Sequence, residues 1–172
     1  IGARRFQSIV LGGLAACAFA AGRLHEAGER IERALALARE TGMGFCGPLV
    51  LGIKARITDD ASEREQCRTE AEALLAQGCA SHNSILFYRH GIEDALVRGE
   101  WARGLEHAAA LEAYTRAEPL PYAEFLIARA RVLIGLVSRP ADRNLPAELA
   151  RLRAEADRVR WPISWPALTA NS

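Results

Sequence analysis

The sequence predicts an all-α fold, an αα-superhelix in which about four helical hairpins follow one another. The first observation is a glycine-containing phrase at residues 22–27 (GRLHEA), which lies between two segments with apolar residues at helical spacing. The second is a similar phrase at residues 99–104 (GEWARG), again between two helical patterns. Their separation fits two repeats of about 38 residues, and no segment shows the alternation of a strand.

Four helices are expected in the first half of the chain, at residues 3–21, 24–41, 46–57 and 61–77. In the second of them, apolar residues recur at steps of three and four, which is the period of an amphipathic helix. Gly42 and Gly44 are expected to break the chain before the third helix. Asp60 or Ser62 can cap the fourth helix, and Gly78 is expected to end it.

Four further helices are expected at residues 82–98, 101–117, 122–137 and 144–159. Pro119 and Pro121 mark the boundary before the seventh helix, because proline is tolerated only in the first turn. The last helix is heavily charged on one face, which is typical of the end of a solenoid. We therefore expect one helical repeat domain at residues 1–160 and a C-terminal tail at 161–172. Trp161 and Trp165 are expected to fold over the fourth hairpin, and an exposed docking patch is the alternative.

Composition excludes several classes of partner. Half of the residues are apolar, and most of these are Ala and Leu, which form helices well. The formal net charge of +1 provides no field to hold a phosphate backbone, so nucleic acid is not an expected partner.

The four cysteines include no CxxC pair, and we expect reduced, mostly buried thiols with no metal and no cofactor. No apolar run reaches about 20 residues, so we expect no membrane span and a cytoplasmic location.

One alternative concerns the N-terminus. Arg4 and Arg5 precede an apolar run at residues 9–21, and Cys17 follows a Leu-Ala-Ala sequence, which together resemble an export signal with a lipoprotein cleavage site. Two glycines interrupt the run, and it continues directly into the turn at residues 22–27. We prefer a first helix here, and an exported repeat lipoprotein stays open as an alternative.

Two resemblances bear on function. The hairpin pattern resembles tetratricopeptide repeats, best in the first hairpin. Residues 82–89 (HNSILFYR) and 111–121 (LEAYTRAEPLP) resemble the C-terminal repeat region of bacterial signalling proteins that join a class III adenylate or guanylate cyclase to an AAA-type ATPase. The resemblance covers residues 40–137 and implies a regulatory or interaction tail. It would place the cyclase and ATPase chemistry upstream, and the chain contains no GxxxxGK[ST] phosphate-binding motif.

The candidate binding residues come from the first helix of each hairpin, because these helices line the concave groove of such a superhelix. The groove is expected to expose six polar side chains: Lys54, Arg89, His90, Glu93, Glu124 and Arg131. Mixed charges there could hold a peptide by charge-assisted hydrogen bonds. The competing interpretation is a solvated helix face with incidental pairs such as Arg89–Glu93. The segment before the prolines is expected to be structural, with Tyr114 in the core and Arg116 capping the helix.

We predict a non-catalytic interaction or regulatory module, since the four histidines are scattered and no nucleophile motif is present. Its expected partner is a protein or peptide, or a neighbouring domain of a longer parent protein. The open N-terminal edge could also pair with a second copy. A small-molecule sensor with its ligand near Arg89 and Glu93 is the main alternative to the interaction module.

Overall fold

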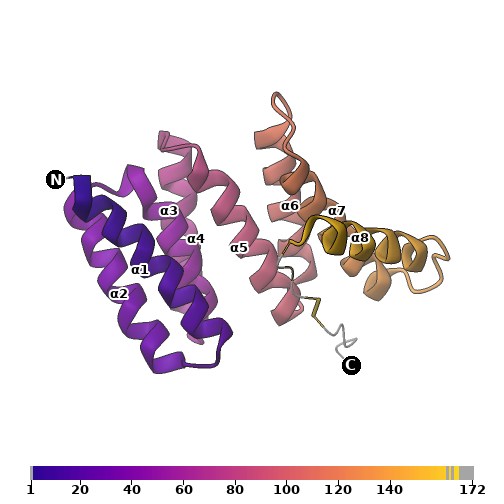
Figure 1. Cartoon of the computed structure of the whole chain (residues 1–172), viewed down its shortest axis with the longest axis horizontal. Coiled ribbons are helices and arrows are strands. Elements are labelled where there is room, and N and C mark those ends of the chain that lie inside the picture. Colours follow the sequence, from indigo (N-terminus) through magenta and orange to yellow (C-terminus); the bar gives the residue numbers. More distant parts are fainter. Residues whose placement is uncertain (1, 162, 164, 167–172) are drawn as a thin grey trace. The chain divides into compact units, whose positions relative to one another are not determined.

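A computed structural model describes residues 2–161, 163, 165 and 166 (Figure 1). These residues contain eight helices and no strand, and sequential helices pair as hairpins, which confirms the predicted all-α class. The helices are α1 (Gly2–Ala20), α2 (Leu24–Thr41), α3 (Met43–Ile57), α4 (Ala61–Gln77), α5 (His82–Arg98), α6 (Trp101–Thr115), α7 (Pro121–Ser138) and α8 (Leu145–Val159). None of the described helices combines the length and the apolar composition that a membrane span requires.

The chain divides into two compact units, Ile1–His90 and Gly91–Ser172, and α5 runs through the boundary. We call them the N-terminal and the C-terminal unit and describe each by itself. The single repeat domain expected at residues 1–160 stays a prediction.

The two turn phrases found in the sequence have the same backbone geometry. Gly22 and Gly99 adopt φ angles of +74° and +72°, a left-handed conformation that disfavours any side chain. In both turns the next residue donates its N–H back to the helix, from Arg23 to the Ala18 carbonyl and from Glu100 to the Ala95 carbonyl, at 2.9 Å each. This six-residue closure is the Schellman motif that ends helices, and it explains why the phrase recurs.

Helix α3 begins three residues earlier than expected, because only one of the two glycines breaks the chain. Gly42 ends α2 with a φ of +108°, whereas Gly44 lies inside α3. Pro48 also lies inside this helix and has no N–H to donate to the Gly44 carbonyl. The N–H of Ala80 fills that place at 3.0 Å.

Asn83, at the start of α5, completes the repair of α3 around its proline. Its side-chain amide accepts a hydrogen bond from the Leu49 N–H at 3.2 Å and donates one to the Phe45 carbonyl at 3.0 Å. In an uninterrupted helix these two backbone groups would bond to each other. Asn83 is completely buried, so the amide joins α3 to α5 inside the core of the N-terminal unit.

A further polar contact in this core links the first three helices. The buried Ser8 hydroxyl on α1 donates to the Ala34 carbonyl of α2 at 2.7 Å and accepts from the Cys46 thiol of α3 at 3.3 Å. All four cysteines are free, as expected, but only Cys46 and Cys67 are buried.

The C-terminal unit is built around α7. Its Arg129 has no exposed surface and donates two hydrogen bonds to Glu93 of α5, at 2.7 and 3.3 Å. Trp165 lies over the Arg129 guanidinium with 5.4 Å to the ring centroid, and Trp161 packs edge-on against Phe125 at 4.9 Å. These contacts confirm the expected cap of tryptophans on the last hairpin. The tail residues 162, 164 and 167–172 lie outside the described residues.

Replacing Asn83 tests the repair of α3. We expect Asn83→Ala to lower the free energy of unfolding by about 2 kcal/mol, because buried backbone groups lose their partners. Urea unfolding monitored by circular dichroism measures the change. Gln66→Ala, at an exposed position of α4, is the control and should change stability by less than about 0.5 kcal/mol. If both variants behave alike, α3 closes its own hydrogen bond and the Asn83 amide is dispensable.

Two glycine substitutions test how closely helices approach. A Cβ on Gly91 of α5 would lie 2.6 Å from the His107 ring of α6, so Gly91→Ala should destabilise the protein by about 1–3 kcal/mol. Gly28 lies in the middle of α2 with nothing within 4 Å of its Cβ position. Gly28→Ala should therefore stabilise it by about 0.5–1 kcal/mol through helix propensity. Thermal unfolding of the two variants measures both changes in stability. A stabilising effect of Gly91→Ala would contradict the close approach of α5 to α6.

Candidate functional site

The six predicted binding residues are divided between the two units. Lys54 lies on α3 in the N-terminal unit and forms ion pairs with Glu32 at 2.7 Å and Glu63 at 3.0 Å. Burial acts to lower the pKa of Lys54, but the hydrogen bonds that Lys54 donates to the two carboxylates outweigh it and the pKa is raised. The Lys54 charge is therefore already balanced by its own unit. Arg89 is half-buried on α5 in the same unit.

His90 and Glu93 are buried, so the expectation that a groove exposes them is wrong. Each has 7% of its surface exposed. Burial, helped by the charges of Arg56 and Arg89, lowers the pKa of His90 to about 3, so the ring is neutral near pH 7. Glu93 is held by Arg129, which lies 36 residues away in the sequence. That distance explains why helical spacing alone did not reveal the burial.

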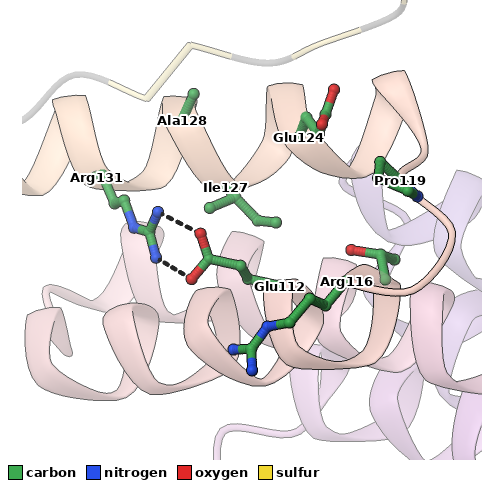
Figure 2. A pocket seen from close by; sticks show the side chains of 8 residues that line it. Glu112, Arg116, Pro119, Glu124, Ile127, Ala128 and Arg131 are labelled. Carbon is green, nitrogen blue, oxygen red and sulfur yellow. Dashed lines mark hydrogen bonds and ion pairs between the residues drawn. The ribbon is translucent and has the colours of Figure 1, made fainter.

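The remaining two residues, Glu124 and Arg131, lie on α7 and line one pocket between α6 and α7 (Figure 2). Arg131 faces Glu112 of α6 across this gap and donates two hydrogen bonds to its carboxylate, at 2.9 and 2.8 Å. Two parallel bonds of this kind fix the orientation of both side chains. The hydrogen bonds from Arg131 lower the pKa of Glu112, so the carboxylate is ionised over the whole neutral range.

The pocket has a volume of about 370 Å³ and combines charged walls with an apolar interior. Its eight lining residues are Glu112, Thr115, Arg116, Pro119, Glu124, Ile127, Ala128 and Arg131. Figure 2 shows Ile127 directed into the space beside the Arg131–Glu112 pair, with Pro119 at one end. The charged ends of Arg116 and Glu124 point away from each other there. Within the described part of the chain, neither Arg116 nor Glu124 forms an ion pair.

The α6 side of this pocket was not among the predicted binding residues. The segment before the prolines was expected to be structural, with Tyr114 in the core, but Tyr114 is 43% exposed. Arg116 occupies the expected C-cap position of α6, and its side chain also lines the pocket. The signal was present, because residues 111–121 carry alternating charges directly before a proline loop. Nothing in one sequence shows, however, that α7 lies opposite them.

Metal binding finds no support in the side-chain arrangement. Among the described residues, no three His, Cys, Asp or Glu side chains lie close enough to hold a metal ion.

No family model, curated protein or solved structure matches this chain. What is established is therefore the helical architecture and the geometry of the site. The resemblance of residues 40–137 to a signalling-protein tail stays a prediction from the sequence.

The buried histidine predicts a pH dependence of stability. The folded pKa of His90 is about 3 and its unfolded pKa is about 6.5, so on acidification the unfolded state takes up the proton first. The contribution of His90 to the free energy of unfolding is fully present above about pH 6.5. It decreases as the pH falls toward 3, by about 1.4 kcal/mol per pH unit.

Unfolding by urea at several pH values between about 7 and 4 should show that His90→Gln loses less stability on acidification than the parent. His25→Gln is the control, because the His25 side chain is 89% exposed, and it should follow the parent. Parallel pH profiles for His90→Gln and the parent would show that the ring is protonated equally easily in both states.

Proposed function

We propose that this chain is a non-catalytic interaction and regulatory module that binds a polypeptide segment at the α6/α7 pocket. The observation that carries the proposal is the composition of that pocket. An oriented, surface-exposed Arg131–Glu112 pair lies beside an apolar interior, and charges of both signs flank it. A polypeptide offers apolar and charged side chains at fixed spacing, which is the combination that such a surface can accept.

The Arg131–Glu112 pair supports recognition because it is both oriented and accessible. Both side chains are close to half exposed, at 46% and 48%. Exposed pairs of this kind contribute at most about 1 kcal/mol to stability, so a ligand can add hydrogen bonds to them, or exchange one partner, at little cost to the fold. The pair therefore acts as a preformed polar clamp on the pocket wall.

Arg116 provides the second element. Its guanidinium lies on the α6 wall, and its charge helps to lower the pKa of Glu112. A guanidinium matches a carboxylate in two parallel hydrogen bonds. A ligand with an acidic side chain opposite Arg116 and an apolar side chain beside Ile127 would use both parts of the pocket. Glu124 on α7 would favour a basic residue at the other end of the segment.

The finer assignment is a tetratricopeptide-like tail of a bacterial protein that carries a cyclase and an ATPase domain. Its support is the phrase at residues 111–121, which also supplies Glu112, Arg116 and Pro119 to the pocket. The sequential helix pairs agree with such a repeat. On this assignment the bound segment belongs to a partner protein or to a neighbouring domain of the same parent chain.

Selection of peptides from a random displayed library on the immobilised protein tests this function. We expect selected peptides to carry an acidic residue near an apolar one, and Arg116→Glu to weaken their binding by about tenfold or more, since charge-assisted hydrogen bonds are lost and repulsion is added. Arg143→Glu changes another exposed arginine, in the loop before α8, and should leave binding intact. Isothermal titration gives the affinities.

The charge-exchanged double variant Glu112→Arg/Arg131→Glu sharpens the test. It retains the ion pair across the gap, so stability should stay within about 1 kcal/mol of the parent. Binding should still fall, because the clamp presents its charges in reversed order. If no peptide is selected, or if Arg116→Glu and Arg143→Glu bind alike, the pocket is not the interaction site.

A further inference from the structure

A second pocket lies in the C-terminal unit between α7 and α8, and its volume is about 220 Å³. Charged and apolar side chains of both helices line it, among them Glu124, Phe125 and Ala128 of α7 and Arg151, Leu152 and Glu155 of α8. Two of these residues, Glu124 and Ala128, also line the α6/α7 pocket. The two pockets therefore adjoin each other along one turn of α7.

The part of α7 that separates the two pockets is low at Ala128. This side chain is a single methyl group, and the residue is half-buried. Figure 2 shows the side chains of Ala128 and Glu124 on the side of α7 that is turned away from the Arg131–Glu112 pair. A segment bound in the α6/α7 pocket can thus pass over Ala128 and reach the second pocket without displacing a large side chain.

The floor of the α7/α8 pocket is apolar and held in place by the core. Phe125 is 3% exposed and Leu152 is 1% exposed. The Phe125 ring packs edge-on against two tryptophan rings, with centroid distances of 4.9 Å to Trp161 and 6.3 Å to Trp165. A floor fixed in this way needs no rearrangement before a ligand binds, which lowers the entropic cost of binding.

The charges around this pocket are mainly negative. Glu124 contributes a carboxylate that forms no ion pair with the described residues. On α8, Arg151 donates two hydrogen bonds to Glu148, at 2.6 and 3.2 Å, and one longer bond to Glu155 at 3.3 Å. Three carboxylates thus surround one guanidinium, and that guanidinium is held mainly by Glu148. The Glu155 carboxylate therefore keeps acceptor positions for a further cation.

The two pockets differ in charge. The α6/α7 pocket contains two arginines and two glutamates, so its charges are balanced. The α7/α8 pocket has an excess of carboxylates above an apolar floor. Long basic side chains match this arrangement, because they bury their methylene stem on apolar surface and keep the charged end near water. A metal ion matches it less well, since the described side chains form no group of three possible ligands.

We propose that the α7/α8 pocket binds a lysine or arginine side chain of the polypeptide segment held in the α6/α7 pocket. The methylene stem lies on Phe125 and Leu152, and the charged end lies between Glu124 and Glu155. This second anchor rests on the proposed function, because one segment must occupy both pockets. It gives the ligand a defined charge order, with an acidic residue at Arg116 and a basic residue beyond Ala128.

The peptides selected from the displayed library on the parent protein are the probes. We expect them to carry a lysine or arginine at a constant distance from their apolar residue. Each is then synthesised with norleucine in place of this basic residue, which keeps the methylene stem and removes the charge. The norleucine form should bind about fivefold more weakly by isothermal titration, because an exposed charge pair is lost.

Glu155→Gln assigns that difference to the second pocket, because Glu155 does not line the first one. It should weaken the basic peptide about fivefold and bring its affinity within about twofold of the norleucine form. Glu106→Gln is the matched control, since it removes an exposed carboxylate of α6 outside both pockets and should change neither affinity. Glu155→Lys should bind a peptide with glutamate at the basic position more tightly than the parent does. Circular dichroism verifies that the variants keep the helix content of the parent.

Three results would overturn the second anchor: selected peptides without a basic residue at a constant position, equal affinities of the basic and norleucine forms, or equal effects of Glu155→Gln and Glu106→Gln. If Arg116→Glu still weakens binding in these cases, the α6/α7 pocket remains the peptide site and only the second anchor is wrong. If no peptide is selected at all, both the proposed function and the second anchor are wrong.

Discussion

The side-chain amide of Asn83 is the interaction on which the packing of the N-terminal unit depends. A proline inside α3 leaves one carbonyl without its donor, and the segment that leads into α5 supplies the missing bonds from Ala80 and Asn83. Because a buried backbone group without a partner costs about 1–3 kcal/mol, this contact selects one register of α5 on α3. The close approach of Phe87 to Gly52, where a Cβ would lie at 3.1 Å, requires that register.

The C-terminal unit uses a buried ion pair for the same purpose. Arg129 is completely buried, and a charge in that position is tolerated only with a well-oriented partner. Glu93 provides it through two hydrogen bonds, and the Trp165 ring covers the guanidinium. The pair adds little net stability compared with apolar residues, but a shifted register of α7 would leave two buried charges apart. In both units, a shift of helix register would leave buried polar or charged groups without partners. This cost in free energy favours a single alignment of the helices.

The sequence was sufficient for features that depend on neighbouring residues and insufficient for those that depend on distant ones. The turns at Gly22 and Gly99 were predicted because a left-handed φ requires glycine locally. The burial of Glu93 was not predicted, because its partner Arg129 lies in another helix 36 residues later. Gly44 was misjudged for a related reason: it lies inside α3, and its carbonyl, which Pro48 leaves without a donor, accepts a hydrogen bond from the distant Ala80 N–H. The pocket could not be predicted for the same reason, because it combines Arg116 at the end of α6 with Ile127 of α7.

Stability and recognition draw on different residues in this chain, and that separation is what a binding scaffold requires. The cores of both units are closed by small and aliphatic side chains and by a few buried polar contacts. The side chains of the proposed binding surface at the α6/α7 pocket, such as Arg116 and Arg131, are exposed and contribute little to those cores. Their identities can therefore change without altering the helix packing, so the same eight helices can present a different surface to a different partner. A fold of this type determines where a partner binds, while the exposed residues determine which partner it is.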